Sequence, residues 1–126
     1  MKSTYISIII FLCLVCFIFY ADNSFKELCN NVIDECNQVL NELNDENWDN
    51  AENISINISK EINYSELLSS VYINHTDFDI LTNESLKLSS YIHRKDDSES
   101  LTSVIQLKEY AINLRDLHKL SIENIF

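Results

Sequence analysis

The residues of this 126-residue chain that are best suited to chemistry are its four cysteines. Cys13 and Cys16 lie inside an N-terminal apolar run, whereas Cys29 and Cys36 stand seven positions apart in the segment ELCNNVIDEC at 27–36. Seven residues of a straight helix span about 10.5 Å along its axis, and a disulfide requires Cα atoms within about 7 Å. A bond between Cys29 and Cys36 therefore requires a break in the helix between them.

Three states of this cysteine pair remain open. The segment could leave the helix and close a local disulfide, both thiols could stay free, or a helical segment could present both sulfurs to a second chain. Apolar residues recur at spacings of four and three through both cysteines, which favours an unbroken helix. Because free thiols are uncommon in oxidising compartments, we expect a covalent homodimer linked through Cys29 and Cys36.

Asparagine supplies a second kind of chemistry, because Asn-x-Ser/Thr is the acceptor pattern for N-glycosylation. Five such sequons occur between residues 53 and 83, at Asn53, Asn57, Asn63, Asn74 and Asn83. Together with the N-terminal apolar run, which is typical of a secretory leader, these sequons predict a glycoprotein whose middle carries sugar. The first and last helical segments expected in the chain would stay uncovered. The alternative is that asparagine-rich sequence forms sequons by chance and that only some are used.

The chain lacks the patterns expected of catalysts and metal sites. Asp45, Asn47 and Asp49 match the first positions of a calcium loop, but Asn50 and Ile56 occupy the places of its glycine and bidentate glutamate. No glycine is present anywhere, which excludes phosphate-binding glycine loops, and no serine nucleophile motif or zinc spacing occurs. We expect no catalytic residue, no metal and no cofactor, and therefore not an enzyme.

The first 21 residues have the layout of a secretory signal peptide, with Lys2, an apolar run over 5–20 and Ala21 at the exit. The run is shorter than the ~20 residues of a transmembrane helix. We therefore expect cleavage after Ala21, which makes 1–21 the signal peptide, leaves 22–126 as a single domain and makes the protein secreted and extracellular. Phe19 stands where the cleavage pattern prefers a small residue, so the alternative is a retained type II membrane anchor.

The formal net charge is −11, and it becomes −12 when Lys2 is removed with the leader. An acidic chain is repelled by the phosphates of nucleic acid and by anionic membrane surfaces. We expect neither a nucleic-acid partner nor stable membrane association once the leader is cleaved. The expected partner is another protein, either a receptor or a host target.

The chain has neither glycine nor proline, which favours helices joined by Asn, Asp and Ser loops. Ser24 and Glu27 form a capping box that predicts the start of the first helix. A polar loop carrying two of the sequons is expected around 44–60, with Trp48 folding back on the bundle. The expected helices cover about 24–46, 61–73, 77–94 and 100–122. The predicted fold class is all-α, a small bundle of about four amphipathic helices.

These features predict a small secreted helical ligand or effector that acts through protein–protein contacts. The build is similar to that of short-chain helical cytokines and of small seminal-fluid, salivary and venom proteins in length, leader, sugars and helicity. Two other functions stay open. One is an extracellular carrier of a small hydrophobic molecule, and the other is a signal-anchored type II membrane interaction protein.

Overall fold

The computed structural model describes the backbone of residues 1–69 and 75–125, and all side chains within these ranges except those of 21, 22, 68, 69, 75 and 118–125. The described chain forms four helices and contains no strand. They are α1 (Lys2–Asn44), α2 (Trp48–Ser69), α3 (His75–His93) and α4 (Asp97–Ile125). The predicted all-α bundle of about four helices is confirmed.

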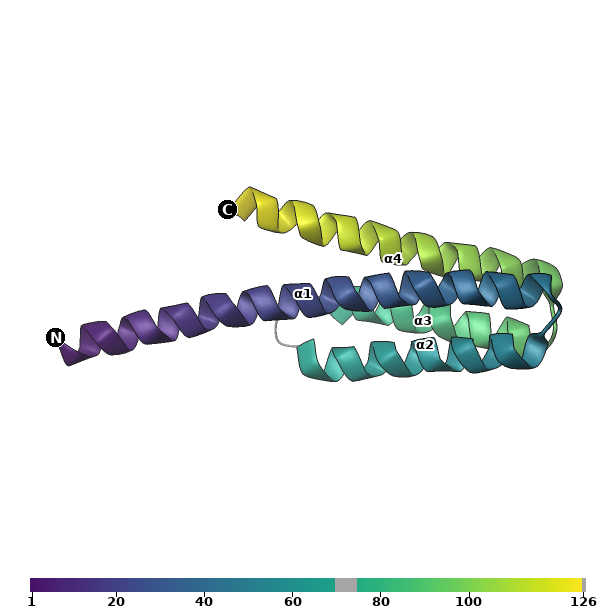
Figure 1. Ribbon diagram of the computed structural model, residues 1–126, viewed down its shortest axis with the longest axis horizontal. Helices are drawn as coiled ribbons and strands as arrows, with labels where there is room; N and C mark the ends of the chain where they lie inside the picture. The colour runs from purple at the N-terminus through teal and green to yellow at the C-terminus, as the bar shows by residue number, and fades with distance from the viewer. Residues whose placement is uncertain (70–74, 126) are drawn as a thin grey trace.

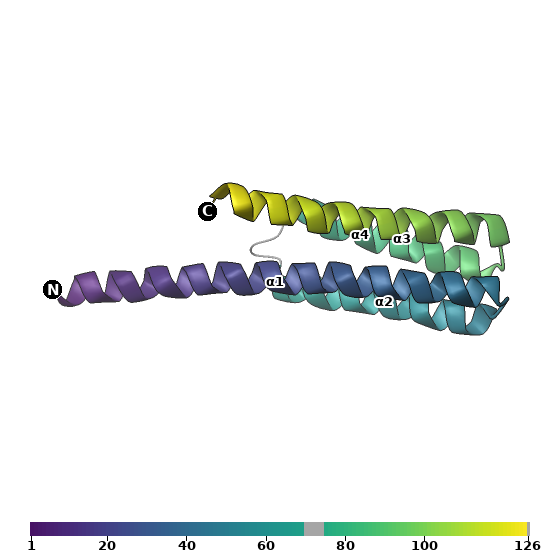
Figure 2. The same ribbon diagram turned by 45° about the horizontal axis from the view of Figure 1, so that its top comes forward.

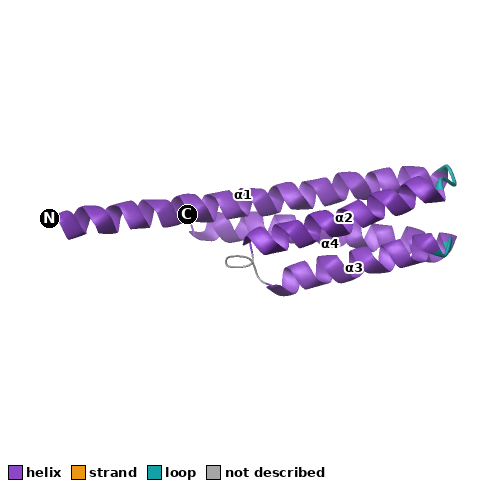
Figure 3. Cartoon of the chain, turned by 90° about the horizontal axis from the view of Figure 1, so that it is seen from below, coloured by secondary structure: helices purple, strands orange, loops and turns teal. Residues whose placement is uncertain are grey.

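The helices run alternately up and down (Figure 1). Each helix packs against the helices before and after it in the chain, and α1 also packs against α4. The turned view shows α1 and α2 as one pair and α3 and α4 as the other (Figure 2). The α1–α2 and α3–α4 loops lie together at the end of the bundle far from the N-terminus, which we call the tip (Figure 3). α1 extends well beyond the other helices at the opposite end.

The core is made by one stripe of each helix. On α1 the predicted series with spacings of four and three is buried throughout, which confirms the sequence pattern. On α4 the series that contains Val104, Leu107, Ala111 and Leu114 is buried as well. Near the middle of α1, where the bundle begins, the ring of Phe25 meets that of Phe78 on α3 edge-to-face, with centroids 5.7 Å apart. This aromatic pair closes the core at the end away from the tip.

The capping box does not start a helix, because α1 is already helical from Lys2 and passes through Ser24 without interruption. The predicted start at residue 24 is therefore wrong. No glycine or proline separates the apolar run from the amphipathic segment, so no strong helix breaker interrupts α1 there. The apolar leader and the first bundle helix are one continuous element.

The predicted polar loop over 44–60 is also wrong, because only residues 45–47 separate α1 from α2. The core stripe of this part of α2 contains Ala51, Ser55, Ile58 and Ser59. Two of these are serines, so the buried face does not read as apolar and its helical period is hidden in the sequence. Trp48 is half-buried against the core, which confirms that it folds back on the bundle.

Both loops at the tip end their helix in the same way. The amide of Glu46 donates to the carbonyl of Leu43 at 3.1 Å, and that of Asn47 donates to Glu42 at 2.8 Å. Lys95 and Asp96 repeat this pattern after α3. This arrangement normally has a glycine in the left-handed conformation, but here Glu46 (φ 58°) and Lys95 (φ 57°) adopt it. The absence of glycine leaves these two positions strained.

Candidate functional site

The apolar part of α1 lies outside the bundle. Its large side chains are exposed on every side of the helix, for example Ile9 at 59% and Leu14 at 56%. Within the described chain, α1 is the helix that is long and apolar enough to cross a membrane, and none of its most apolar stretch is buried in the protein. Signal sequences share this property, so the fold itself does not distinguish a leader from an anchor.

The structure places Cys29 and Cys36 on the unbroken helix α1 as free, fully buried thiols. A local disulfide does not fit this helix, because α1 keeps the two residues about 10.5 Å apart along its axis. Neither sulfur is exposed, so a covalent link between two chains would require the bundle to open. Of the three states of the pair, the structure has the free thiols.

Burial makes both thiols poor nucleophiles. It raises the pKa of Cys29 from 9.0 to about 12, with Arg115 opposing and Asp77 adding to the shift. Burial likewise raises the pKa of Cys36 to about 12, reinforced by the charge of Glu35. Because the thiolate is the reactive form, these cysteines act as core residues.

The sequon asparagines Asn53, Asn57, Asn63 and Asn83 are all exposed, while Asn74 lies outside the described residues. The described four are on helices α2 and α3. Residues two apart on a helix point about 200° away from each other, so an outward asparagine pairs with an inward serine in the same motif.

The inward serines explain why these motifs recur. Ser59 donates to the hydroxyl of Ser85 at 2.9 Å, and Ser89 donates to that of Ser55 at 3.0 Å. These bonds join α2 to α3 through small side chains that allow close approach. Three of the four hydroxyls, those of Ser55, Ser59 and Ser85, belong to sequons, so packing between the two helices accounts for the pattern independently of glycosylation.

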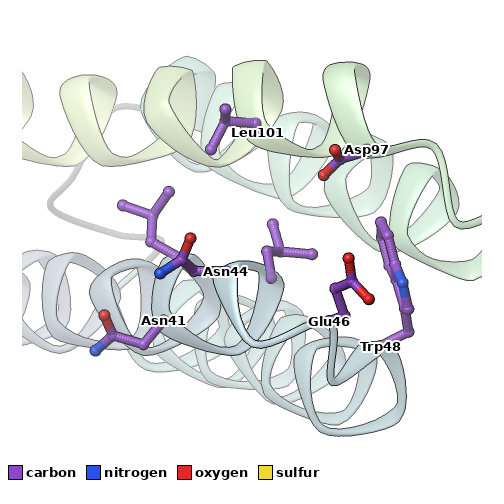
Figure 4. Close-up of a pocket in the computed structure, with 8 residues that line it drawn as sticks. Asn41, Asn44, Glu46, Trp48, Asp97 and Leu101 are labelled. Carbon is purple, nitrogen blue, oxygen red and sulfur yellow. The ribbon is translucent and has the colours of Figure 1, made fainter.

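The tip of the bundle contains a half-open pocket of about 750 Å³ between the end of α1, the first loop and the start of α4 (Figure 4). Its wall combines aliphatic, aromatic, amide and carboxylate groups. The lining residues are Leu40, Asn41, Leu43, Asn44, Glu46, Trp48, Asp97 and Leu101. Asp97 and Leu101 come from the α4 side, and the others come from the α1–α2 side.

The segments around this pocket carry much of the negative charge of the protein. Residues 42–52 contain five acidic residues and no basic one, and 94–99 contain three acidic and two basic residues. Among the described side chains, no group of three or more His, Cys, Asp and Glu residues is arranged to hold a metal ion. The pocket therefore offers carboxylates at an apolar and aromatic surface and no cluster suited to a metal.

A second acidic feature lies between α1 and α2. The carboxyl groups of Glu35 and Glu61 approach each other, and one oxygen of each is buried with no hydrogen-bond partner among the described residues. Burial, followed by the hydrogen bond and charge of Glu61, raises the pKa of Glu35 from 4.5 to about 8; the charge of Asp34 adds to this shift and the Asn57 amide opposes it. Protonated Glu35 can donate to Glu61, which removes the repulsion between the two groups.

Sequence reasoning missed both acidic features. The pocket is lined by residues near 45 and residues near 100, which are far apart in the sequence. The two carboxyl groups come together because α1 packs beside α2. The available signals were the concentration of acidic residues at 42–52 and the single tryptophan within it. Neither signal specifies which helices meet there.

No curated protein and no solved structure matches the chain. A family model does match, over residues 19–125. The match covers the end of the apolar segment and all four helices of the bundle. The chain belongs to the family described as a domain of unknown function, DUF4363.

Proposed function

We propose that this protein is a membrane-tethered interaction protein, in which the apolar part of α1 spans a membrane and the acidic bundle is held outside the cell. The observation that carries the proposal is the exposure of apolar side chains on all sides of α1 before the bundle begins. A helix that is apolar all round needs a nonpolar environment. Water does not supply one, and the bundle covers none of this stretch.

The length of the uncharged stretch supports a span. Residues 3–21 contain no charged side chain, and 19 residues at 1.5 Å each extend about 28 Å, close to the thickness of the hydrocarbon core. Tyr5 and Tyr20 lie near its two ends and are both exposed. Tyrosine is enriched at membrane interfaces, so these positions suit the boundaries of a span.

The distribution of positive charge supports an orientation. Lys2 lies directly before the apolar stretch, whereas Lys26, five positions beyond its end, is the only basic residue in the 20 positions that follow it. Positive charge is retained on the cytoplasmic side, which directs the bundle outward. The continuous helix then holds the tip about 35 Å from the membrane, since α1 has 23 residues from Asp22 to Asn44, both included.

A released form is the second candidate, and one observation favours it. The buried core begins at Phe25, so cleavage after Ala21 would leave the whole core intact. The product would be the secreted ligand or effector that the sequence predicts.

In either form, glycosylation would have to occur before α2 and α3 fold, because the helix separates each asparagine from its serine. Enzymatic removal of N-glycans followed by gel mobility would test for it.

Membrane fractionation of cells that express the full chain tests the proposal. We expect the protein in the carbonate-resistant membrane fraction, with an intact mass that includes residues 1–21. Phe19→Ala creates the small residue that signal peptidase prefers at that position, and we expect it to convert the anchored protein into a released form that begins at Asp22.

Two arginines in the apolar stretch, Leu12→Arg and Leu14→Arg, should abolish membrane retention because each costs about 3 kcal/mol in a bilayer. Leu67→Arg is the matched control, because Leu67 is 81% exposed on the bundle; it should leave retention unchanged. A wild-type protein that is soluble and starts at Asp22 would overturn the anchor and support the secreted form.

A further inference from the structure

We propose that the tip pocket binds an arginine side chain, flanked by apolar residues, from a partner protein. The inference deepens the proposed interaction function and rests on it, because an anchored α1 displays the tip away from the membrane. It names the recognition surface and the chemistry of the partner. The proposal stands on the composition, shape and charge of the pocket.

The wall of the pocket combines aliphatic and aromatic side chains. Leu40, Leu43 and Leu101 provide aliphatic surface, and Trp48 adds an aromatic ring. Cations are attracted to the face of an aromatic ring, and among aromatic residues tryptophan attracts them best. An arginine fits such a wall because its three-carbon stem is apolar while its planar guanidinium stacks on aromatic faces.

Two carboxylates, those of Glu46 and Asp97, line the pocket. Glu46 comes from the α1–α2 loop and Asp97 from the first turn of α4, so they approach the pocket from two elements. Planar guanidinium groups pair with carboxylates through two parallel hydrogen bonds. The side-chain amide oxygens of Asn41 and Asn44 can accept hydrogen bonds from the remaining N–H groups of the guanidinium.

The segments around the pocket are negatively charged, and the pocket is open at the end of the bundle. The net negative charge of the segments around the pocket attracts basic partners over longer distances. Half of the lining residues are polar or charged, which does not suit a carrier of a hydrophobic molecule. The half-open shape at the end of the bundle suits a protruding side chain of another protein.

Trp48 makes the test direct, because it is the only tryptophan of the chain. The full chain in neutral detergent micelles is titrated with N-acetyl-Leu-Arg-Leu-amide while tryptophan emission is recorded. The matched peptide contains citrulline in place of arginine, which keeps the shape and removes the charge. We expect saturable binding of the arginine peptide and at least fivefold weaker binding of the citrulline peptide.

The double variant Glu46→Gln/Asp97→Asn should weaken binding of the arginine peptide at least fivefold. The control variant Glu27→Gln/Glu109→Gln removes the same charge from exposed positions away from the pocket, and it should bind as the wild type does. Circular dichroism checks that both variants keep the helical fold.

Several outcomes would overturn the inference. They are no emission change, equal binding of the two peptides, or equal loss in the two double variants. Agmatine alone carries the guanidinium without a peptide, and if it binds as tightly as the tripeptide, the ligand is a small cation and not a partner protein. Because the titration uses detergent-solubilised protein, its failure would leave the membrane-fractionation result standing, and the reverse also holds.

Discussion

Glu35 of α1 and Glu61 of α2 share one amide between them: the side-chain nitrogen of Asn57 lies 3.4 Å from Oε1 of Glu35 and 3.2 Å from Oε1 of Glu61. Two carboxyl groups this close do not both ionise easily. Burial, ahead of the hydrogen bond and charge of Glu61, raises the pKa of Glu35 to about 8 and so favours its protonated form. This pair makes the α1–α2 interface sensitive to pH.

The stability of the bundle should therefore fall as the pH rises from 5 to 8.5. The folded protein keeps the Glu35 proton up to about pH 8, whereas the unfolded chain releases it near 4.5. Between these values the folded state binds more protons, so its free energy of unfolding decreases with pH. Urea unfolding at several pH values measures this slope. Glu35→Gln should flatten it, and Glu109→Gln, a change at an exposed site, should not.

The buried thiols should resist alkylation in the folded protein. Treatment with iodoacetamide followed by peptide mass mapping should leave Cys29 and Cys36 unmodified, because burial raises the pKa of both to about 12. Both should react after unfolding in guanidinium. Asn30→Cys places an exposed thiol on the same helix and should react in the folded state. Cys13 and Cys16 are exposed, so the gel test uses a Cys13→Ser/Cys16→Ser background, in which a covalent dimer on a non-reducing gel would contradict this packing.

Glycine at position 95 should stabilise the protein. Lys95 adopts a left-handed backbone conformation, which costs a residue with a Cβ atom about 1 kcal/mol and glycine much less. Lys95→Gly should raise the free energy of unfolding by ~1 kcal/mol and the melting temperature by roughly 4–8 °C. Ser90→Gly, inside α3 and exposed, should instead lower the stability by roughly 0.5 kcal/mol. A destabilised Lys95→Gly variant would argue against this loop geometry.

The serine contact between α2 and α3 should show energetic coupling. Ser59→Ala and Ser85→Ala each remove one partner of a buried 2.9 Å hydrogen bond, and each should cost about 1 kcal/mol. The double variant should cost less than the sum, with a coupling of at least about 0.5 kcal/mol. Chemical unfolding of the four proteins measures this cycle. Ser90→Ala provides a neutral exposed control, and additive single effects would mean that the hydroxyls do not interact.

Helix α1 shows how far a repeated pattern can lead. Phe25, Val32 and Val39 were expected on one face because of their spacing, and all three are buried. A helical period depends only on local geometry and on which side chains avoid water, so it is legible in the sequence. The same reasoning failed for α2, where Ser55 and Ser59 occupy buried positions and a polar residue reads as an exposed one.

Residue patterns alone were enough to predict an all-helical chain with an apolar N-terminal segment, a net negative charge and a cysteine pair on one helical face. The helix through 27–36 could be predicted from its spacing, but the packing of the four helices was needed to show that its thiols face the core of the same chain. The same packing places Trp48, Glu46 and Asp97 around one pocket at the tip. These outcomes depend on the register between helices, which is set by the packing of side chains distant in the chain.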